Sequence, residues 1–308
     1  MSSVVGTLLH INPLEVSLAR RGFLIPPEQV RARLEGVGET FLRGYHAALA
    51  GVDLNTLALR LDAIDAEFRG FGYEGAAMAL DLLDQFTPWQ PSRTARFLAG
   101  PAEPHTYMVI VGIGWSMARL RFRFNHRFSK LDPLLRWLAV DGWGFHEGYF
   151  HWERYAGGRP HPRQLKGYAS RAFDQGLGRS VWFVSGADVD AIFTLVEGFP
   201  DSRRKDLWSG VGLACAYAGG ADHEGIRSLR SAAGPWWPHL AQGAVFAAKA
   251  RSRAGNPTDY TEEACRLLAG LSAIEAAALS DLMLGQIVED AEPAYEVWRT
   301  RVQMYLSD

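Results

Sequence analysis

The densest group of side chains that could do chemistry lies at the centre of the chain, in residues 141–153. It holds His146, Glu147 and His151 among glycines and aromatic rings. Two histidines four residues apart on a helix, with a glutamate beside the first, form a zinc motif in which the glutamate acts as base. Here the spacing is one residue longer, so on a regular helix the two rings diverge by roughly 140°. The pattern favours hydrogen-bonded histidines in a glycine-rich turn. His146 and His151 are metal ligands only if an irregular loop brings them together.

Two further histidines follow prolines in related motifs 134 positions apart, at residues 100–105 and 234–239. A histidine after a proline at a helix start can cap free backbone groups, and a duplicated turn would keep it for that reason. Alternatively, His105 and His239 face each other across a pseudo-symmetry axis. They could then act as an acid–base pair, because histidine titrates near neutral pH.

Carboxylates offer another possibility. Asp62 and Asp65 resemble a fragment of the aspartate motifs by which all-α terpene cyclases hold magnesium or protonate an alkene, although the full motif is absent. Carboxylates three residues apart are also common on a solvated helix face. We therefore retain Asp62 and Asp65 as reserve acids, behind His105, His239 and the central His146-Glu147 pair.

Aromatic residues are abundant, and ten of them are tryptophans. Large rings beside glycine gaps are typical of an apolar pocket for a long hydrocarbon ligand. The candidate substrate-binding side chains lie near the glycine-rich stretches: Trp115, Trp143, Tyr149, Trp208 and Trp236.

Motifs for standard cofactors and nucleophiles are missing. The glycine-rich stretch 208–220 has neither a dinucleotide fingerprint nor a phosphate-binding loop, and no flavin or nucleotide motif occurs elsewhere. Cys215 has no base beside it and is not spaced from Cys265 as a metal or redox pair, so both read as buried, reduced thiols. An oxidation would therefore require a partner protein or a bound metal.

Composition limits the class of protein. The chain has 308 residues, of which 48% are hydrophobic and 21% charged, and its net charge is −2. That balance gives no reason to expect a nucleic-acid or anionic-membrane partner. Residues 1–11 lack a signal-peptide pattern, and the apolar stretch 107–118 is far shorter than the roughly 20 residues of a membrane helix. We expect a soluble, cytoplasmic protein without a membrane span.

Helical periodicity predicts an all-α fold. Prolines at 26 and 27 mark a helix start, Ser272 and Glu275 form a capping box, and the β-rich runs 108–111 and 181–184 are short enough to be buried helix turns. Apolar residues recur at the helical period in stretches 34–49, 54–68, 76–86, 131–138, 189–196 and 207–217.

The self-match predicts an internal duplication. Phe41 and Gly44 correspond to Phe173 and Gly176, and weaker matches continue through most of each half. We expect two helical halves related by a pseudo-twofold axis. Residues 1–155 would carry the central His/Glu-rich segment, 156–308 would be the duplicate, and the Gly/Pro-rich stretch 156–163 would link them. A cleft along the axis is the natural place for a site.

Several stretches together resemble a known family: residues 68–78, 131–137, 141–150, 172–180, 206–215 and 255–257. The chain is similar, over roughly residues 10 to 300, to the actinobacterial domain-of-unknown-function family typified by the UnbL-type enediyne biosynthesis proteins. Such proteins are encoded beside the iterative enediyne polyketide synthase. The resemblance implies a part in converting a linear polyene into the enediyne core, and it assigns no catalytic residue.

The leading hypothesis is thus a natural-product biosynthesis protein that acts on a linear hydrophobic polyene in a cleft between two halves. As an enzyme it would be a cofactor-independent cyclase or isomerase, or another polyene-modifying enzyme. Two alternatives stay open: a terpene-cyclase-like enzyme acting on an isoprenoid chain, and a non-catalytic polyene carrier or scaffold. An enzyme should place polar groups of perturbed pKa in its cavity, whereas a carrier's cavity should be uniformly apolar. Expected partners are the hydrophobic substrate and other proteins of the same pathway.

Overall fold

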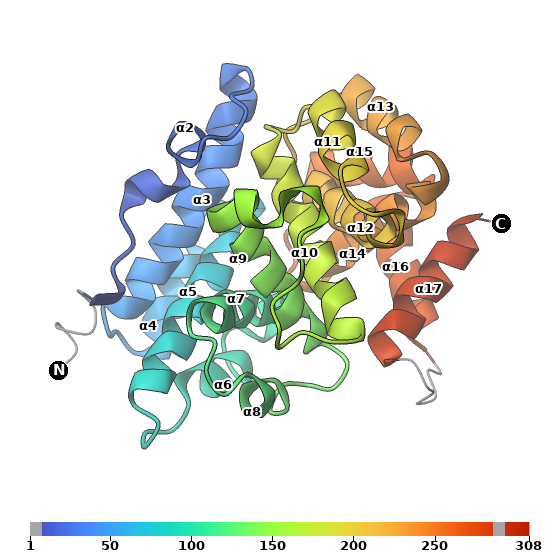
Figure 1. Cartoon of the computed structure of the whole chain (residues 1–308). Helices are drawn as coiled ribbons and strands as arrows, with labels where there is room; N and C mark the ends of the chain where they lie inside the picture. Colours follow the sequence, from blue (N-terminus) through green and yellow to red (C-terminus); the bar gives the residue numbers. More distant parts are fainter. Residues whose placement is uncertain (1–7, 286–292, 308) are drawn as a thin grey trace.

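The computed structural model describes residues 8–285 and 293–307, which form helices and turns with no strand among them (Figure 1). The all-α prediction is confirmed. The elements are η1 (Pro13–Val16), α2 (Leu18–Arg21), α3 (Glu28–Leu49), α4 (Leu54–Asp62), α5 (Ala66–Phe86), α6 (Arg93–Leu98), η2 (Glu103–His105), α7 (Thr106–Arg119), α8 (Phe124–Phe128), α9 (Trp137–Tyr155), η3 (Ala156–Gly158), α10 (Tyr168–Val184), α11 (Val189–Glu197), α12 (Asp201–Ala218), α13 (His223–Ala233), η4 (Gly234–Trp236), α14 (Trp237–Arg253), α15 (Asp259–Ala269), α16 (Ala273–Leu284) and α17 (Ala294–Ser307).

Most local signals appear where the sequence placed them. The runs 108–111 and 181–184 are buried turns of α7 and α10, and Ser272 and Glu275 form the expected capping box. One predicted helix is interrupted, because the chain leaves the helical conformation at Asp65 (φ −49°, ψ 134°) and separates α4 from α5. Of the predicted helix 131–138, only the end is part of a long helix, which begins at Trp137.

The long helices form a single row in chain order. Helix α3 packs on α5, α5 on α7, α7 on α9, α9 on α10, α10 on α12, and α12 on α14 (Figure 1). No helix of the described residues is by itself long and apolar enough to cross a membrane. Helices α15 and α16 meet that test only as a pair, on length and composition, across a bend of 64°.

Paired glycines explain how closely these helices approach. Helices α7, α9, α10 and α12 each carry a Gly-x-Gly sequence, in which the first glycine faces the preceding helix and the second faces the next. A Cβ atom on Gly176 would lie 1.8 Å from the carbonyl oxygen of Asp141 in α9. On Gly178 it would lie 2.0 Å from that of Leu207 in α12. Any side chain at these positions would force the backbones apart.

This packing pattern repeats at a short interval. The first glycines of the pairs are residues 112, 142, 176 and 210, and Gly243 of α14 packs on α12 in the same way. The two Gly-Pro motifs lie 134 residues apart in the sequence, one before α7 and one before α14. Helix α14 is the fourth helix after α7 in this row. The structure thus shows a repeat of single helices 30 to 34 residues apart. The division into two pseudo-symmetric halves stays a prediction.

The ends of the row meet and enclose an interior. Arg251, near the end of α14, donates to the carbonyl oxygens of Tyr217 in α12 (2.6 Å) and Glu67 in α5 (2.9 Å). Arg33 of α3 donates to the carbonyl oxygen of Ala218 (2.6 Å). The last turns of α12 and α14 therefore lie against the first turn of α5.

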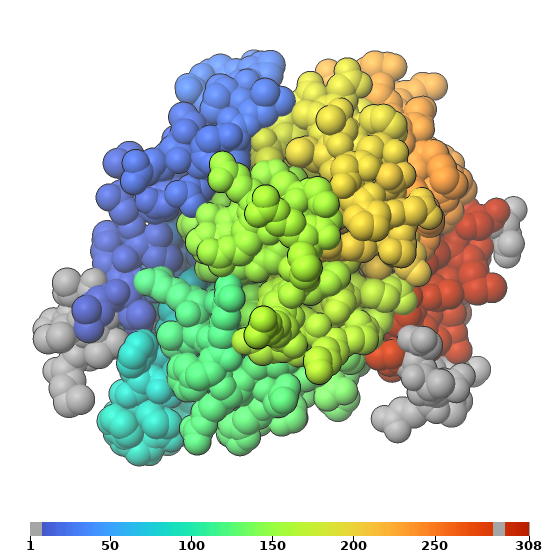
Figure 2. Space-filling view, viewed as in Figure 1, coloured from blue at the N-terminus to red at the C-terminus, as the bar shows by residue number. Residues whose placement is uncertain are grey.

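The stretch predicted as a linker packs on the helices that follow it. The His161 ring lies 2.8 Å from the carboxylate of Asp174 in α10, and Arg203 of α12 donates to the carbonyl oxygen of Arg159 at 3.0 Å. In Figure 2 this light-green segment covers the centre of the face, between the blue N-terminal and the yellow and orange C-terminal helices. The domain boundary at 155/156 stays a prediction.

Candidate functional site

A row of polar residues runs through the interior, one from nearly every long helix. Each immediately precedes the glycine that packs on the preceding helix, and all are buried: Glu74, Asp141, Gln175, Ser209 and Gln242. Neighbours in the row bond to one another. Gln175 donates to the Asp141 carboxylate at 2.9 Å, and Ser209 donates to the Gln242 side-chain oxygen at 2.9 Å. The helix packing itself therefore aligns these groups.

Glu74 differs from the other members because its carboxyl group has no hydrogen-bond partner in the described chain. The side chain is 1% exposed, and neither oxygen accepts a hydrogen bond. The Trp115 indole N–H approaches it without reaching hydrogen-bond geometry. Burial raises the pKa of Glu74 to about 7, against the opposing effect of nearby Arg179, while Asp141 adds to the rise. Glu74 can therefore hold or release a proton at neutral pH.

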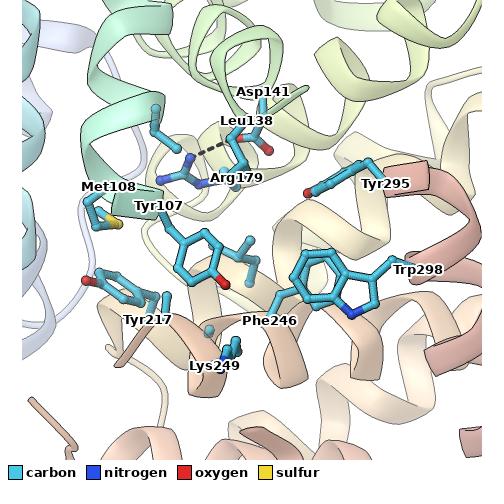
Figure 3. A pocket seen from close by; sticks show the side chains of 14 residues that line it. Tyr107, Met108, Leu138, Asp141, Arg179, Tyr217, Phe246, Lys249, Tyr295 and Trp298 are labelled. Carbon is cyan, nitrogen blue, oxygen red and sulfur yellow. Dashed lines mark hydrogen bonds and ion pairs between the residues drawn. The ribbon is translucent and has the colours of Figure 1, made fainter. Parts of the chain in front are cut away.

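Arg179 and Asp141 form a buried ion pair beside Glu74. Arg179 Nη1 donates to Asp141 Oδ1 at 2.6 Å, drawn as a dashed line in Figure 3. The guanidinium also lies 4.5 Å from the centre of the Phe145 ring. Asp141 and Glu74 both help to raise the pKa of Arg179 above its ordinary value, in opposition to burial, so the arginine remains a fixed positive charge.

Two small cavities adjoin this group. The C-terminal cavity, about 40 Å³, has room for two or three water molecules. It is lined by Tyr107, Met108, Val111, Leu138, Asp141, Arg179, Leu213, Tyr217, Phe246, Ala247, Lys249, Ala250, Tyr295 and Trp298 (Figure 3). The N-terminal cavity, about 30 Å³, is lined by Ile11, Val16, Val37, Gly38, Phe41, Leu42, Phe71, Glu74, Trp115, Phe145, Tyr149, Phe150 and Phe183.

Among the described residues, the lining of the N-terminal cavity is apolar apart from three groups, one of which is the Trp115 indole N–H. Tyr149 donates its hydroxyl proton to the carbonyl oxygen of Val16 at 3.2 Å, and burial raises its pKa above the ordinary value. Glu74 is the third, and it is the one carboxyl group that these residues contribute to the lining. The cavity thus presents a single acid to whatever enters among the aromatic rings.

The central His/Glu cluster lies in the second half of α9, where the ring centre of His146 is 5.5 Å from that of Trp115. Glu147 is 0% exposed and receives hydrogen bonds from Arg121 and Tyr155, both at 2.7 Å. Burial works to raise its pKa, but His146, Tyr155 and Arg121 lower it to about 2. Glu147 is therefore an anion held by its neighbours, and at neutral pH it has no proton to donate.

A break in α9 brings the two histidines of this cluster closer than a regular helix would. The backbone is non-helical at His151, and the ring centres of His146 and His151 lie 6.2 Å apart. Burial lowers the pKa of both rings. His146 Nδ1 lies 3.6 Å from the Glu147 carboxylate. Within residues 8–285 and 293–307, however, no three His, Cys, Asp or Glu side chains gather as metal ligands.

The structure does not bring His105 and His239 together. His105 stacks on Tyr73 with ring centres 4.0 Å apart, and its surroundings include Arg251 near the end of α14. His239 lies in the first turn of α14, twelve residues from Arg251, which corresponds to about 18 Å along the helix. Burial lowers the pKa of each to about 4. This arrangement gives no support to an acid–base pair across a pseudo-axis, and that pairing stays a prediction.

The reserve acids lie at the surface. Asp62 is exposed at the end of α4 and accepts a hydrogen bond from the Tyr73 hydroxyl at 2.9 Å, and Asp65 is exposed at the start of α5. Neither lines one of the two cavities. Cys215 and Cys265 are both buried and unpaired, as expected.

Two of the five predicted substrate-binding aromatics line a cavity. Trp115 and Tyr149 both belong to the N-terminal cavity. Trp143 and Trp208 are fully buried in the core, and Trp236 lies in the turn before α14; none of these three lines either cavity.

Sequence reasoning missed Glu74, Arg179 and Asp141, although a signal for the last two was present. In four helices the residues on either side of Gly-x-Gly are four apart, so they share one helix face. Those pairs are Val111 and Trp115, Asp141 and Phe145, Gln175 and Arg179, and Ser209 and Leu213. Because both glycines contact neighbouring helices, this face points into the bundle.

These features define a class: an all-α protein with a glycine-packed row of helices, an aligned polar interior and an unpaired acid in an aromatic cavity. The family follows from the sequence comparison, since residues 1–306 match the family described as Protein of unknown function (DUF1702). The chain belongs to that family, which confirms the expected domain-of-unknown-function relationship. No curated protein and no solved structure matches the chain.

Proposed function

We propose that this protein is an enzyme that transfers a proton to an unsaturated apolar chain, with Glu74 as the acid. The observation that carries the proposal is the Glu74 carboxyl group, buried without a partner in a cavity of aromatic rings. A carrier would have no use for a neutral acid in that position, and burying one without a hydrogen bond destabilises the fold.

The geometry supports a simple proton cycle. The Glu74 proton adds to one carbon of a double bond, and the other carbon becomes positively charged. The electron-rich faces of Trp115 and Phe145 can stabilise that charge, as aromatic rings stabilise cations elsewhere. Loss of a proton from a neighbouring carbon to the carboxylate then restores Glu74 and leaves an isomerised or cyclised chain. No electrons are gained or lost overall.

Arg179 has a supporting role in this cycle. When Glu74 gives up its proton it becomes a buried anion, which is costly in a low-dielectric interior. The Arg179 charge lowers the pKa of Glu74, so it stabilises the anion that forms. The Arg179–Asp141 pair keeps that charge in place.

We further propose that the natural substrate is a linear polyene of an enediyne-type pathway, handled in the cytoplasm with other proteins of that pathway. The support is the resemblance of residues 68–78 and 141–150, among other stretches, to the UnbL-type proteins. A terpene-cyclase-like enzyme acting on an isoprenoid chain would use the same acid. The magnesium-binding version of that alternative has less support, because Asp62 and Asp65 lie at the surface.

The test follows proton transfer directly. The conjugated tetraene trans-parinaric acid is incubated with the protein in deuterium oxide, and its mass and ultraviolet spectrum are recorded. We expect the wild type to introduce deuterium at carbon and to alter the conjugation, and Glu74→Gln to abolish both. Glu39→Gln, a matched change at an exposed position of α3, should leave the rate unchanged.

Other results would redirect the proposal. Binding of the tetraene without deuterium uptake by the wild type would identify a carrier. Deuterium uptake that persists in Glu74→Gln and disappears in Asp62→Asn or Asp65→Asn would move the acid to the end of α4.

A further inference from the structure

The two cavities lie one helical turn apart along the same three helices. On α7, Val111 lines the C-terminal cavity and Trp115 the N-terminal cavity. The same offset of four residues separates Asp141 from Phe145 on α9, and it recurs on α10 between residues 179 and 183. Four residues rise about 6 Å along a helix. The cavities are therefore stacked end to end.

The wall between them is a thin layer of side chains. Arg179 lines the C-terminal cavity and lies 4.5 Å from the ring centre of Phe145, which lines the N-terminal cavity. Glu74 lines the N-terminal cavity and interacts with the charge of Arg179. The Arg179 side chain, held by its ion pair with Asp141, thus separates the two spaces, and a bound chain must displace it to join them.

We propose that the two cavities are the two ends of one channel that binds a linear aliphatic chain, with Glu74 beside its middle. The proposal deepens the proposed function, because it fixes the shape of the substrate at the same acid. Along α9 the lining extends from Leu138 to Phe150, which corresponds to about 18 Å of helix. The cavities hold about 40 and 30 Å³, so a chain bound through both must also push the lining side chains apart.

Polarity sets the direction of the bound chain. Lys249 lines the C-terminal cavity, is partly exposed, and pairs with the exposed Asp281. Tyr107 and the unpartnered hydroxyl of Tyr217 line the same cavity. An anionic head group that takes the place of the Asp281 carboxylate then binds at the Lys249 end, and the hydrocarbon tail passes Arg179 into the N-terminal cavity.

Saturated fatty acids test the channel separately from the chemistry. They carry no double bond, so the result does not depend on proton transfer by Glu74. Affinities of a series from octanoic to palmitic acid are measured by displacement of trans-parinaric acid. Each methylene that enters an apolar site should tighten binding by roughly fourfold. We expect that gain to continue to palmitic acid, with one molecule bound per chain.

A variant in the N-terminal cavity, where the tail of a long chain would lie, gives a second test of the affinity for fatty acids. Ile11→Trp narrows the N-terminal cavity and should weaken palmitic acid at least tenfold while leaving octanoic acid unchanged. Leu14→Trp, at a side chain 64% exposed in the same segment, is the matched control and should change neither.

Two outcomes would overturn the channel. One is an affinity that stops rising at the shorter acids of the series in the wild type. The other is a palmitic acid affinity that is the same in Ile11→Trp as in Leu14→Trp. Either result leaves the deuterium experiment untouched, and a failure of Glu74→Gln to change deuterium uptake leaves the length series untouched.

Discussion

At Glu74 the stability of the fold and the proposed function make opposite demands on the side chain. An unpaired carboxyl group in an apolar interior lowers the stability of the folded state, and a glutamine or leucine of similar size would avoid the ionisation. A glutamate at this position is explained if its proton is used. The same reasoning does not apply to Glu147, whose hydrogen bonds from Arg121 and Tyr155 account for its burial.

The stability of the protein should therefore depend on the proton of Glu74. The pKa is about 7 in the folded chain against an ordinary value of 4.5. Folding takes up a proton between these values, so stability is fully present below about pH 4.5 and falls as pH rises through about 7. At roughly 1.4 kcal/mol per pH unit, the loss is on the order of 3 kcal/mol.

Replacement of Glu74 by Gln removes this pH dependence. In urea denaturation the free energy of unfolding of Glu74→Gln should exceed that of the wild type at about pH 8 and approach it near pH 4. A constant difference between the two proteins over that range would contradict the raised pKa. Glu39→Gln should show no difference that grows with pH.

The rate of the proposed reaction should depend on the same proton of Glu74. If Glu74 donates the proton, the rate of deuterium uptake by the tetraene falls as pH rises through about 7, because the acid loses its proton there. The measurement is the initial rate between about pH 5 and pH 9. A rate that rises over this range would indicate that the carboxylate acts as a base.

Part of this site could be predicted from the sequence, but Glu74 at its centre could not. Trp115 and Tyr149 were predicted because large aromatic residues beside glycines favour an apolar pocket, and both line the N-terminal cavity. Glu74 escaped notice because a single glutamate among glycines carries no motif. Its burial depends on α7 and α10, and those contacts are set by tertiary packing.

At the scale of single helices, close packing depends on glycine at particular positions. The helical periodicity was enough to predict that α3, α5 and α12 exist. Which helices are neighbours depends on which glycine faces which carbonyl group. Hydrophobic periodicity carries no information about this pairing. In α7, α9, α10 and α12 the Gly-x-Gly sequences record it, since each of these helices has close neighbours on both sides.

Substitution by alanine should distinguish glycines that touch a neighbouring helix from glycines that do not. In Gly176→Ala the new Cβ would lie 1.8 Å from the Asp141 carbonyl oxygen, so α9 and α10 must move apart and stability should fall by several kcal/mol. In Gly36→Ala the nearest atom is 3.7 Å away, on Phe68. That variant should gain about 0.5–1 kcal/mol from helix propensity.

Chemical denaturation of both variants provides the comparison. Loss of stability in Gly36→Ala as large as in Gly176→Ala would mean that glycine is needed for flexibility and not for close packing. The expected pattern is opposite signs, because both residues lie inside long helices and differ mainly in what their Cβ atoms would meet.

For the molecule as a whole, closure of the row is what creates an interior. Helices that merely follow one another could form an open stack, with Glu74 near an accessible face. Arg251 and Arg33 prevent this by holding the ends of α12 and α14 against α3 and α5. Contacts such as Arg251 with Glu67 join residues 184 positions apart, which is why neither helix periodicity nor the repeated motifs predicted them.

Removal of this contact should open the molecule at one place. Arg251 is 1% exposed, and Arg251→Met takes a charged donor from two backbone carbonyl groups, which keep only the longer hydrogen bonds from the Tyr260 hydroxyl at 3.3 and 3.5 Å. We expect a loss of about 1.5–3 kcal/mol, the usual contribution of a hydrogen bond to a charged group. Amide hydrogen exchange should accelerate first in the early turns of α5 and the last turns of α12 and α14.

The neighbouring Arg253 provides the comparison on the same helix. It is partly exposed and pairs with the exposed Glu103, so Arg253→Met should cost less than about 1 kcal/mol and leave exchange in α5 unchanged. Equal protection of α5 in the two variants would show that the row stays closed without Arg251. In that case the isolation of Glu74 from water would depend on the glycine crossings alone.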